Sequence, residues 1–305
     1  MSEKKAVTVS RRFAMNEFRT IGLVLILYCL LVLYLPIPVN EFLAIKKISK
    51  IWILDVDFLV SLVTLVLGTF FPFLVLKIAY NDVMPPRAKV RVSFLGLIAN
   101  FVVFFAAISA SIFLMTVISN FFNIPGQLVS GIGVSIDIDK LNDYFYIATF
   151  IFISPFLEEY AFRGVLLHSL GRYGKSFALY ASAICFALAH GSFSEFLPSL
   201  VMGIILGKQS LRYKSYFPGL LLHICFNLFL YLLFIVPEGL GFYISLLLCL
   251  VYVIAFFLVL TRQYEVIRIR KGRNIGRNIA LFLSSPTVII ALLLFVGHSV
   301  LIWIL

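Results

Sequence analysis

Long apolar stretches separated by short polar links dominate the pattern of residues along this chain. A helix needs about 20 consecutive apolar residues to cross the hydrocarbon core of a bilayer, and most of these stretches come close to that length. The pattern therefore predicts an all-α fold, a polytopic membrane bundle with nine spans. Their expected bounds are about 20–37, 58–80, 93–119, 144–169, 176–190, 195–211, 216–236, 240–261 and 279–303.

Two segments depart from this simple pattern. Span 176–190 is short for a crossing and is expected to be tilted or extended. Residues 39–56 mix three lysines with Ile, Leu and Trp, and we expect them to lie along a membrane interface.

No internal repeat, low-complexity tract or long linker divides the chain. A single polytopic membrane domain over residues 1–305 is therefore expected.

The composition agrees with a membrane protein. The 305 residues are 62% hydrophobic and 13% charged, whereas soluble domains are about 45–50% apolar and about 25% charged. The net charge of +11 is compatible with a nucleic-acid partner. However, the basic residues cluster between the apolar spans, as the positive-inside rule describes. We therefore expect the lipid bilayer, and no nucleic acid, as a partner.

The basic residues also predict the orientation. They gather in the N-terminal segment and in the links 81–92, 170–175, 207–215 and 262–278, which are alternate connections if the N-terminus is cytoplasmic. The first outer connection, with three lysines, is an exception.

The first apolar run has no A-x-A-like cleavage site, which indicates a retained span. The expected location is an integral, multi-pass position, in the plasma membrane if the cell is bacterial.

Three polar motifs interrupt the predicted spans. A charged group at the centre of a bilayer costs about 2.5–3.5 kcal/mol on insertion scales, so such groups indicate either a paired structural lock or chemistry. The motifs combine two acids, one arginine, two histidines and one asparagine at helical spacings. They are Glu158-Glu159-x-x-x-Arg163, Phe186-x-x-x-His190 and His223-x-x-x-Asn227.

The expected depths of these groups overlap. With a rise of 1.5 Å per residue, Glu158 and Asn227 lie about 17 Å from the predicted inner boundaries, His190 about 21 Å and His223 about 11 Å. Three different spans thus bring polar side chains to the middle of the membrane. This agreement predicts one shared site.

The two adjacent glutamates are expected to have different roles. Glu159 and Arg163 are four residues apart on one helical face and are predicted to form an ion pair. Glu158 points about 100° away and has no expected partner on its own helix, which suits a general base. A structural lock would need only one acid. Pro155 frees a backbone carbonyl and could open space for water beside Glu158, although an ordinary membrane-helix proline explains it equally well.

The second and third motifs complete the predicted site. His190 lies one turn after Phe186, whose ring is expected to support the imidazole. His223 and Asn227 share a face and can donate hydrogen bonds to an oxyanion. Taken alone, His190 would be a structural histidine, and His223 with Asn227 would be a polar pair that joins two helices. Together with the acid pair, they are interpreted as catalytic.

The remaining candidates are interpreted as structural. Cys225 lies between two motif residues, but a cysteine in a membrane helix usually behaves as a small hydrophobe. His168 is expected near an interface, and His298 stands alone in the last span. Asp137-x-Asp139 lacks an EF-hand pattern and is read as a solvated loop.

Over residues 144–236, the order and spacing of the three motifs resemble the CAAX prenyl endopeptidase and bacteriocin-processing (Abi) family of intramembrane glutamic proteases. The resemblance implies about eight membrane helices around a water-filled polar cavity. Some members carry a polar Asn or His one turn after the second-motif histidine. Ser194 stands there in this chain, so a fourth polar group in the cavity is not expected from the motif.

The resemblance also implies roles for individual residues. The first glutamate of the first motif activates water with help from the histidine of the second. The two polar residues of the third motif hold the carbonyl oxygen. The implied catalytic residues are Glu158, His190, His223 and Asn227, and Glu159 and Arg163 support the site.

The sequence thus predicts an intramembrane endopeptidase that acts on a membrane-associated protein or peptide without a metal or other cofactor. One alternative is a zinc peptidase with His190, His223 and a glutamate as ligands, although no H-E-x-x-H pattern is present. A second is a non-proteolytic scaffold or immunity protein of the same fold, which would act through a membrane protein partner.

Overall fold

Helices make up almost all of the described chain. Two very short strands, β1 (Lys50–Ile51) and β2 (Leu54–Asp55), pair antiparallel in the connection before the third helix. The all-α bundle predicted from hydropathy is therefore confirmed. The computed structural model describes residues 11–51, 54–80, 94–122, 141–235, 240–260 and 275–304.

The N-terminal helix is longer than predicted. α1 (Arg11–Tyr28), the π-helical η1 (Cys29–Tyr34) and α2 (Pro36–Ile45) form one helical stretch of 35 residues. α2 thus extends the first helix into the segment 39–56, and the paired strands β1 and β2 follow it, whereas the expected interfacial position of 39–56 stays a prediction. Proline is tolerated in the first turn of a helix, and Leu35 N–H bonds to the carbonyl of Leu30 at 2.8 Å, so the chain passes through a π turn without ending the helix.

The other helices begin and end within a few residues of the predicted spans. α5 to α7 form one continuous stretch that contains two π segments and ends in a short 3₁₀ turn. The helices after α2 are α3 (Val56–Ala79), α4 (Phe94–Phe122), α5 (Leu141–Ala148), η3 (Thr149–Ile153), α6 (Ser154–Glu158), η4 (Glu159–Leu166), α7 (Leu167–Leu170), η5 (Gly171–Tyr173), α8 (Lys175–Ala189), α9 (Phe193–Tyr213), α10 (Phe217–Ile235) and α11 (Gly241–Leu260).

The last predicted span, 279–303, is broken in the structure. α12 (Ile275–Leu283) and α13 (Pro286–Ile304) meet at an angle of 77°. Pro286 has no N–H to continue the hydrogen bonds of α12, but its fixed φ suits the first position of a new helix. The prediction of one uninterrupted span was therefore wrong.

The chain is an integral membrane protein by the length and apolar character of its helices. Four described stretches are long and apolar enough to cross a membrane, or five if the bent α12–α13 pair counts as one. The predicted number of nine spans and the cytoplasmic N-terminus stay predictions. The four stretches are Arg11–Ile45, Val56–Ala79, Ile98–Phe122 and Asp143–Tyr173, and shorter apolar helices lie at Lys175–Ala189, Phe217–Leu232 and Leu247–Val259.

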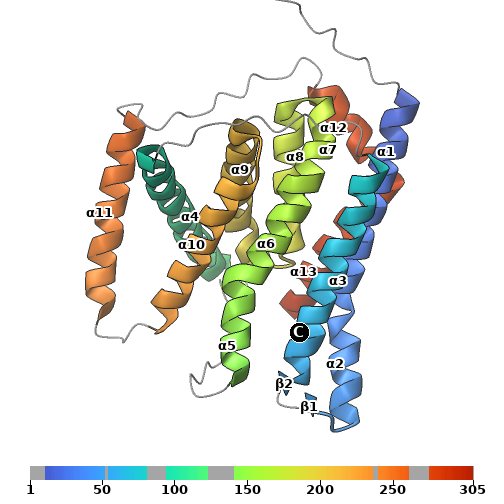
Figure 1. Cartoon of the computed structure of the whole chain (residues 1–305), viewed down its shortest axis with the longest axis horizontal. Helices are drawn as coiled ribbons and strands as arrows, with labels where there is room; N and C mark the ends of the chain where they lie inside the picture. Colours follow the sequence, from blue (N-terminus) through green and yellow to red (C-terminus); the bar gives the residue numbers. More distant parts are fainter. Residues whose placement is uncertain are drawn as a thin grey trace, which may run out of the picture.

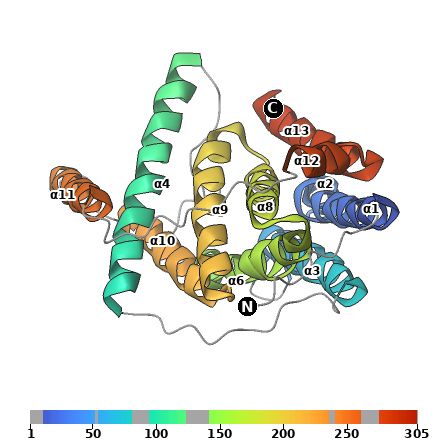
Figure 2. The same ribbon diagram turned by 90° about the horizontal axis from the view of Figure 1, so that it is seen from above.

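The helices stand side by side, with the motif-bearing ones in the middle of the bundle (Figures 1 and 2). α1 packs on α3 and α13 at one end. α8 and α9 form an antiparallel hairpin, and α9 also contacts α4 and α10. α11 lies at the opposite edge against α4. The three motifs, on α6 and η4, at the end of α8 and on α10, are thus covered on both sides by other helices.

A chain of buried aromatic rings ties the N-terminal helices to the motif-bearing ones. Phe162 packs against Tyr28 at 5.8 Å, Phe73 at 5.5 Å and Phe186 at 5.3 Å between ring centroids. Such tilted and edge-to-face pairs are favourable beyond their buried area. Because Phe186 belongs to the second motif, this packing fixes one side of the predicted site.

The contact between α1 and α13 depends on a glycine. A Cβ atom at Gly22 would clash with Thr287 Oγ1 and lie 2.5 Å from the backbone nitrogen of Val288. Small residues permit such close approach of membrane helices. We expect Gly22→Ala to destabilise the protein by about 1–3 kcal/mol, measured as a lower melting temperature in detergent.

The matched control is Gly276→Ala on α12, where nothing lies within 4 Å of the added methyl group. It should leave the melting temperature nearly unchanged. Equal melting temperatures for the two variants would contradict the close α1–α13 contact.

Candidate active site

A proline creates a hydrogen-bond acceptor at the site. Ser154 N–H bonds to the carbonyl of Thr149, five residues back, and Pro155 has no N–H to give to the carbonyl of Phe150. Asn227 Nδ2 on α10 donates to that carbonyl at 2.8 Å. The prediction that Pro155 frees a backbone carbonyl is confirmed, and the freed carbonyl holds the third-motif asparagine.

The acid pair has the predicted asymmetry. Arg163 lies 2.8 Å from Glu159 Oε1, which confirms the expected ion pair. The Glu159 side chain is fully buried, whereas that of Glu158 is 17% exposed. The expectation that Glu158 has no partner on its own helix was wrong, because Ser154 Oγ, four residues earlier on the same face, donates to Glu158 Oε1 at 2.5 Å.

His223 lies between the two glutamates. Its Nδ1 is 3.2 Å from Glu159 Oε1, and its Nε2 is 3.9 Å from Glu158 Oε2. A carboxylate can only accept, so Nδ1–H is the donor to Glu159. Because Arg163 and His223 share one oxygen of Glu159, the ion pair of the first motif also fixes the orientation of this imidazole.

His190 is held at the end of α8. It follows the last helical residue, and its Nδ1 lies 2.8 Å from the carbonyl of Phe186. The carbonyl only accepts, so Nδ1 carries the proton, and Nε2 of the neutral ring keeps its lone pair. The ring centroids of His190 and Phe186 are 4.8 Å apart, and the Arg163 guanidinium lies 3.9 Å from the Phe186 centroid. The expected support by Phe186 is confirmed.

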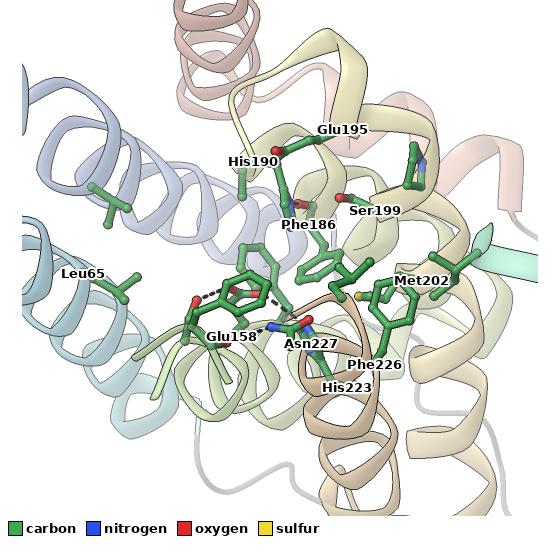
Figure 3. Close-up of a pocket in the computed structure, with 18 of the residues that line it drawn as sticks. Leu65, Glu158, Phe186, His190, Glu195, Ser199, Met202, His223, Phe226 and Asn227 are labelled. Atoms are coloured by element: carbon green, nitrogen blue, oxygen red, sulfur yellow. Dashed lines mark hydrogen bonds and ion pairs between the residues drawn. The ribbon is translucent and has the colours of Figure 1, made fainter. Parts of the chain in front are cut away.

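One cavity of about 490 Å³ brings the predicted residues together. Glu158, His190, His223 and Asn227 all line it, although they come from three separate helical stretches. Glu195 and Ser199 of α9 line it near the α8–α9 turn (Figure 3). Much of the remaining lining is apolar, including Val32, Leu65, Ile108, Ile112, Met202, Phe226 and Leu230.

The sequence reasoning missed three polar residues of this cavity: Ser154, Glu195 and Ser199. Ser154 had a readable signal, because it lies one helical turn before Glu158. Glu195 follows His190 across a turn, so helical spacing could not relate the two. Ser194, at the position where some family members carry a polar residue, is fully buried and is not part of the cavity lining.

The candidates interpreted as structural lie away from the cavity lining. Cys225 is exposed, whereas His223 and Asn227 on the same helix are buried, so its thiol faces away from the site. His168 and His298 do not line the cavity either. Asp137 and Asp139 lie outside the described residues.

Within the described ranges, no three His, Cys, Asp or Glu side chains are grouped closely enough to hold a metal ion. His223 directs Nδ1 to Glu159, and His190 directs Nδ1 to a backbone carbonyl. The Nε2 atoms of both histidines and the carboxylate of Glu158 are therefore the groups that remain as possible metal ligands. The assignment of no cofactor stays a prediction.

Comparison with known proteins supports the resemblance drawn from the motifs. Residues 140–229 match the model of the family described as type II CAAX prenyl endopeptidase Rce1-like. No curated protein and no solved structure matches the chain. The matched segment runs from α5 into α10 and contains all three motifs. The predicted likeness to the CAAX endopeptidase family is therefore confirmed over residues 140–229.

Proposed function

We propose that this protein is an intramembrane endopeptidase that hydrolyses a peptide bond of a membrane-associated protein or peptide. The cavity that collects Glu158, His190, His223 and Asn227 carries the proposal. Its volume lies within the range of about 300–1,000 Å³ that is usual for ligand sites. The match of residues 140–229 to a family of prenyl endopeptidases supports a protease over other uses of such a cavity.

Glu158 is the proposed general base. Its side chain is 17% exposed, whereas that of Glu159 is fully buried. One oxygen of Glu158 accepts from Ser154, and the other, Oε2, is buried without a hydrogen-bond partner among the described residues. Its other oxygen takes a proton from water while the water oxygen attacks the carbonyl carbon. Glu158 then gives that proton to the leaving nitrogen as the C–N bond breaks. The products are a carboxylic acid and an amine, and the base is regenerated without a covalent intermediate.

His190 is proposed to help hold the attacking water. The hydrogen bond from its Nδ1–H to the Phe186 carbonyl directs the Nε2 lone pair away from that backbone. An acceptor of this kind can orient a water molecule whose second proton goes to Glu158. His190 therefore acts on the water, and the ring of Phe186 keeps the imidazole in place.

His223 and Asn227 are proposed to stabilise the oxyanion. The imidazolium form of His223 has a proton on each ring nitrogen, so it can donate from Nε2 while Nδ1–H stays bonded to Glu159. Its Nε2–H then faces the Glu158 side of the cavity. Asn227 uses one N–H for Phe150 and keeps a second for the oxyanion. Such donors typically contribute about 3–4 kcal/mol each.

The test of this function compares cells that express the natural protein with cells that express Glu158→Ala. New N-termini of membrane proteins or peptides should appear only with the natural protein. Cys225→Ala is the matched control, because this exposed residue lies on α10 outside the cavity lining and should preserve the cleavage. If the termini are identical while a phenotype persists in Glu158→Ala cells, a scaffold role replaces the protease.

The zinc alternative is decided by a separate measurement. The proposal expects active protein to keep its hydrolysis rate after treatment with a strong chelator, with no stoichiometric zinc in elemental analysis. Loss of activity with chelator and recovery with zinc would make Glu158, His190 and His223 candidate zinc ligands. The proposed role of Glu158 as the general base would then be replaced by activation of water on the metal.

A further inference from the structure

The turn between α8 and α9 carries His190 into the cavity. α8 ends at Ala189, and α9 begins at Phe193. Two backbone hydrogen bonds hold the turn, from His190 N to Ala187 O at 3.4 Å and from Gly191 N to Leu188 O at 3.0 Å. Residues beyond the end of a helix lack its regular hydrogen bonds. The position of His190 therefore depends on what else holds this turn.

His298, from the last helix, holds the turn. Its Nδ1 lies 3.2 Å from the carbonyl of Gly191, which can only accept, so Nδ1–H is the donor. Gly191 has φ of +65°, and a Cβ there would lie 2.6 Å from His298 Nδ1. The glycine is thus required both by its backbone conformation and by the closeness of the imidazole.

His298 is itself held by neighbours from the N-terminal half. The ring of Tyr34 lies edge-on at 5.3 Å, and its hydroxyl donates to the carbonyl of Leu294, one turn before His298, at 2.9 Å. The imidazole is buried, with 6% exposed. Neither Tyr34 nor His298 belongs to the segment 140–229 that matches the endopeptidase family.

We propose that His298 is a positioning residue for the reaction, which acts by holding the Gly191 carbonyl and thereby the approach of His190 to the water. This inference rests on the proposed function. It also gives α13, which lies outside the matched segment, a part in catalysis. A displacement of about 1 Å at a catalytic group can cost about 100-fold in rate, so a distant hydrogen bond can matter.

The experiment compares His298→Phe with His298→Asn, using purified full-length protein and a peptide found to be cleaved in cells. Phenylalanine keeps a ring beside Tyr34 but has no donor. Asparagine keeps an N–H close to the position of Nδ1. We expect His298→Phe to lower kcat by about 10- to 100-fold with KM little changed, and His298→Asn to keep most of the activity.

A double-variant comparison separates positioning from general stability. In a His190→Ala background, His298→Phe should cause no further loss, because its effect passes through His190. Hydrogen exchange at residues 190–192 should rise in His298→Phe and stay near the natural level in His298→Asn. Equal additional loss in both backgrounds, or unchanged exchange and kcat in His298→Phe, would overturn the proposal.

The failures of the two proposals are distinguishable. If the natural protein hydrolyses peptides and His298→Phe does so equally well, only the role of His298 is lost. If the natural protein and Glu158→Gln are equally inactive on every peptide released in cells, the proposed function fails and the role of His298 fails with it.

Discussion

Replacing Glu158 by glutamine is expected to lower kcat by about 100- to 10,000-fold, the usual contribution of general acid–base catalysis. Glutamine keeps the shape of the side chain, and its Oε1 can still accept from Ser154 Oγ. The variant therefore removes the basicity of the carboxylate and leaves the surrounding contacts in place. The measurement is single-turnover hydrolysis of a membrane peptide by purified protein, with the melting temperature as a check on folding.

Ser154→Ala is the matched comparison for this result. It removes the 2.5 Å hydrogen bond to Glu158 Oε1 but leaves the carboxylate. The full loss of a hydrogen bond to a charged group, about 1.5–3 kcal/mol, would correspond to about 10- to 150-fold in rate. We expect a loss near the lower end, about tenfold, because water in the cavity can take the place of the hydroxyl. Undiminished hydrolysis by Glu158→Gln would remove this residue from the mechanism.

Replacing Arg163 by methionine is expected to destabilise the protein by about 3–5 kcal/mol, because it leaves the buried Glu159 carboxylate without its cation. Both side chains of this pair are essentially inaccessible, at 1% and 0% exposure. Methionine can still pack on Phe186, so the loss reports the charge. Thermal or denaturant unfolding in detergent gives the measurement, and hydrolysis should fall as well because Glu159 orients His223.

Two further variants sharpen this prediction. Glu159→Gln with Arg163→Met removes both charges and should recover most of the lost stability, but not the activity, since His223 then lacks its carboxylate partner. Lys175→Met removes a positive charge from an exposed side chain and should change the free energy of unfolding by about 0.5 kcal/mol or less. Similar losses for Arg163→Met and Lys175→Met would contradict the importance of the buried pair.

The periodicity of the motifs predicted part of the site correctly. Glu159 with Arg163 and Phe186 with His190 are pairs at a spacing of four, and this spacing brings both together in the structure. The same rule, applied backwards from Glu158, would have found Ser154. Glu195 was not predictable in this way, because it reaches the cavity across a turn whose direction depends on Gly191.

The fold was predictable where hydrophobic length decides it and less so where prolines interrupt it. α3, α4 and α11 lie close to the expected spans, because a long apolar run in a bilayer must satisfy its backbone as a helix. Two prolines that each stand at the first position of a helix behave differently. Pro36 follows a π turn and continues the first helix, whereas Pro286 marks a 77° bend. The packing of neighbouring helices decides between these two outcomes, and the local sequence around each proline does not contain that information.

By itself, the sequence determined the class of protein, the identity of the polar groups in the membrane and the pairings along one helix, since these depend on hydropathy and on the helical repeat. Only the tertiary structure decided that His223 lies between two glutamates, that Asn227 takes the carbonyl released by Pro155, and that His298 reaches the turn beside His190. These contacts join residues 64 to 107 positions apart. Their partners are set by how helices pack against one another, which no spacing within a single helix encodes.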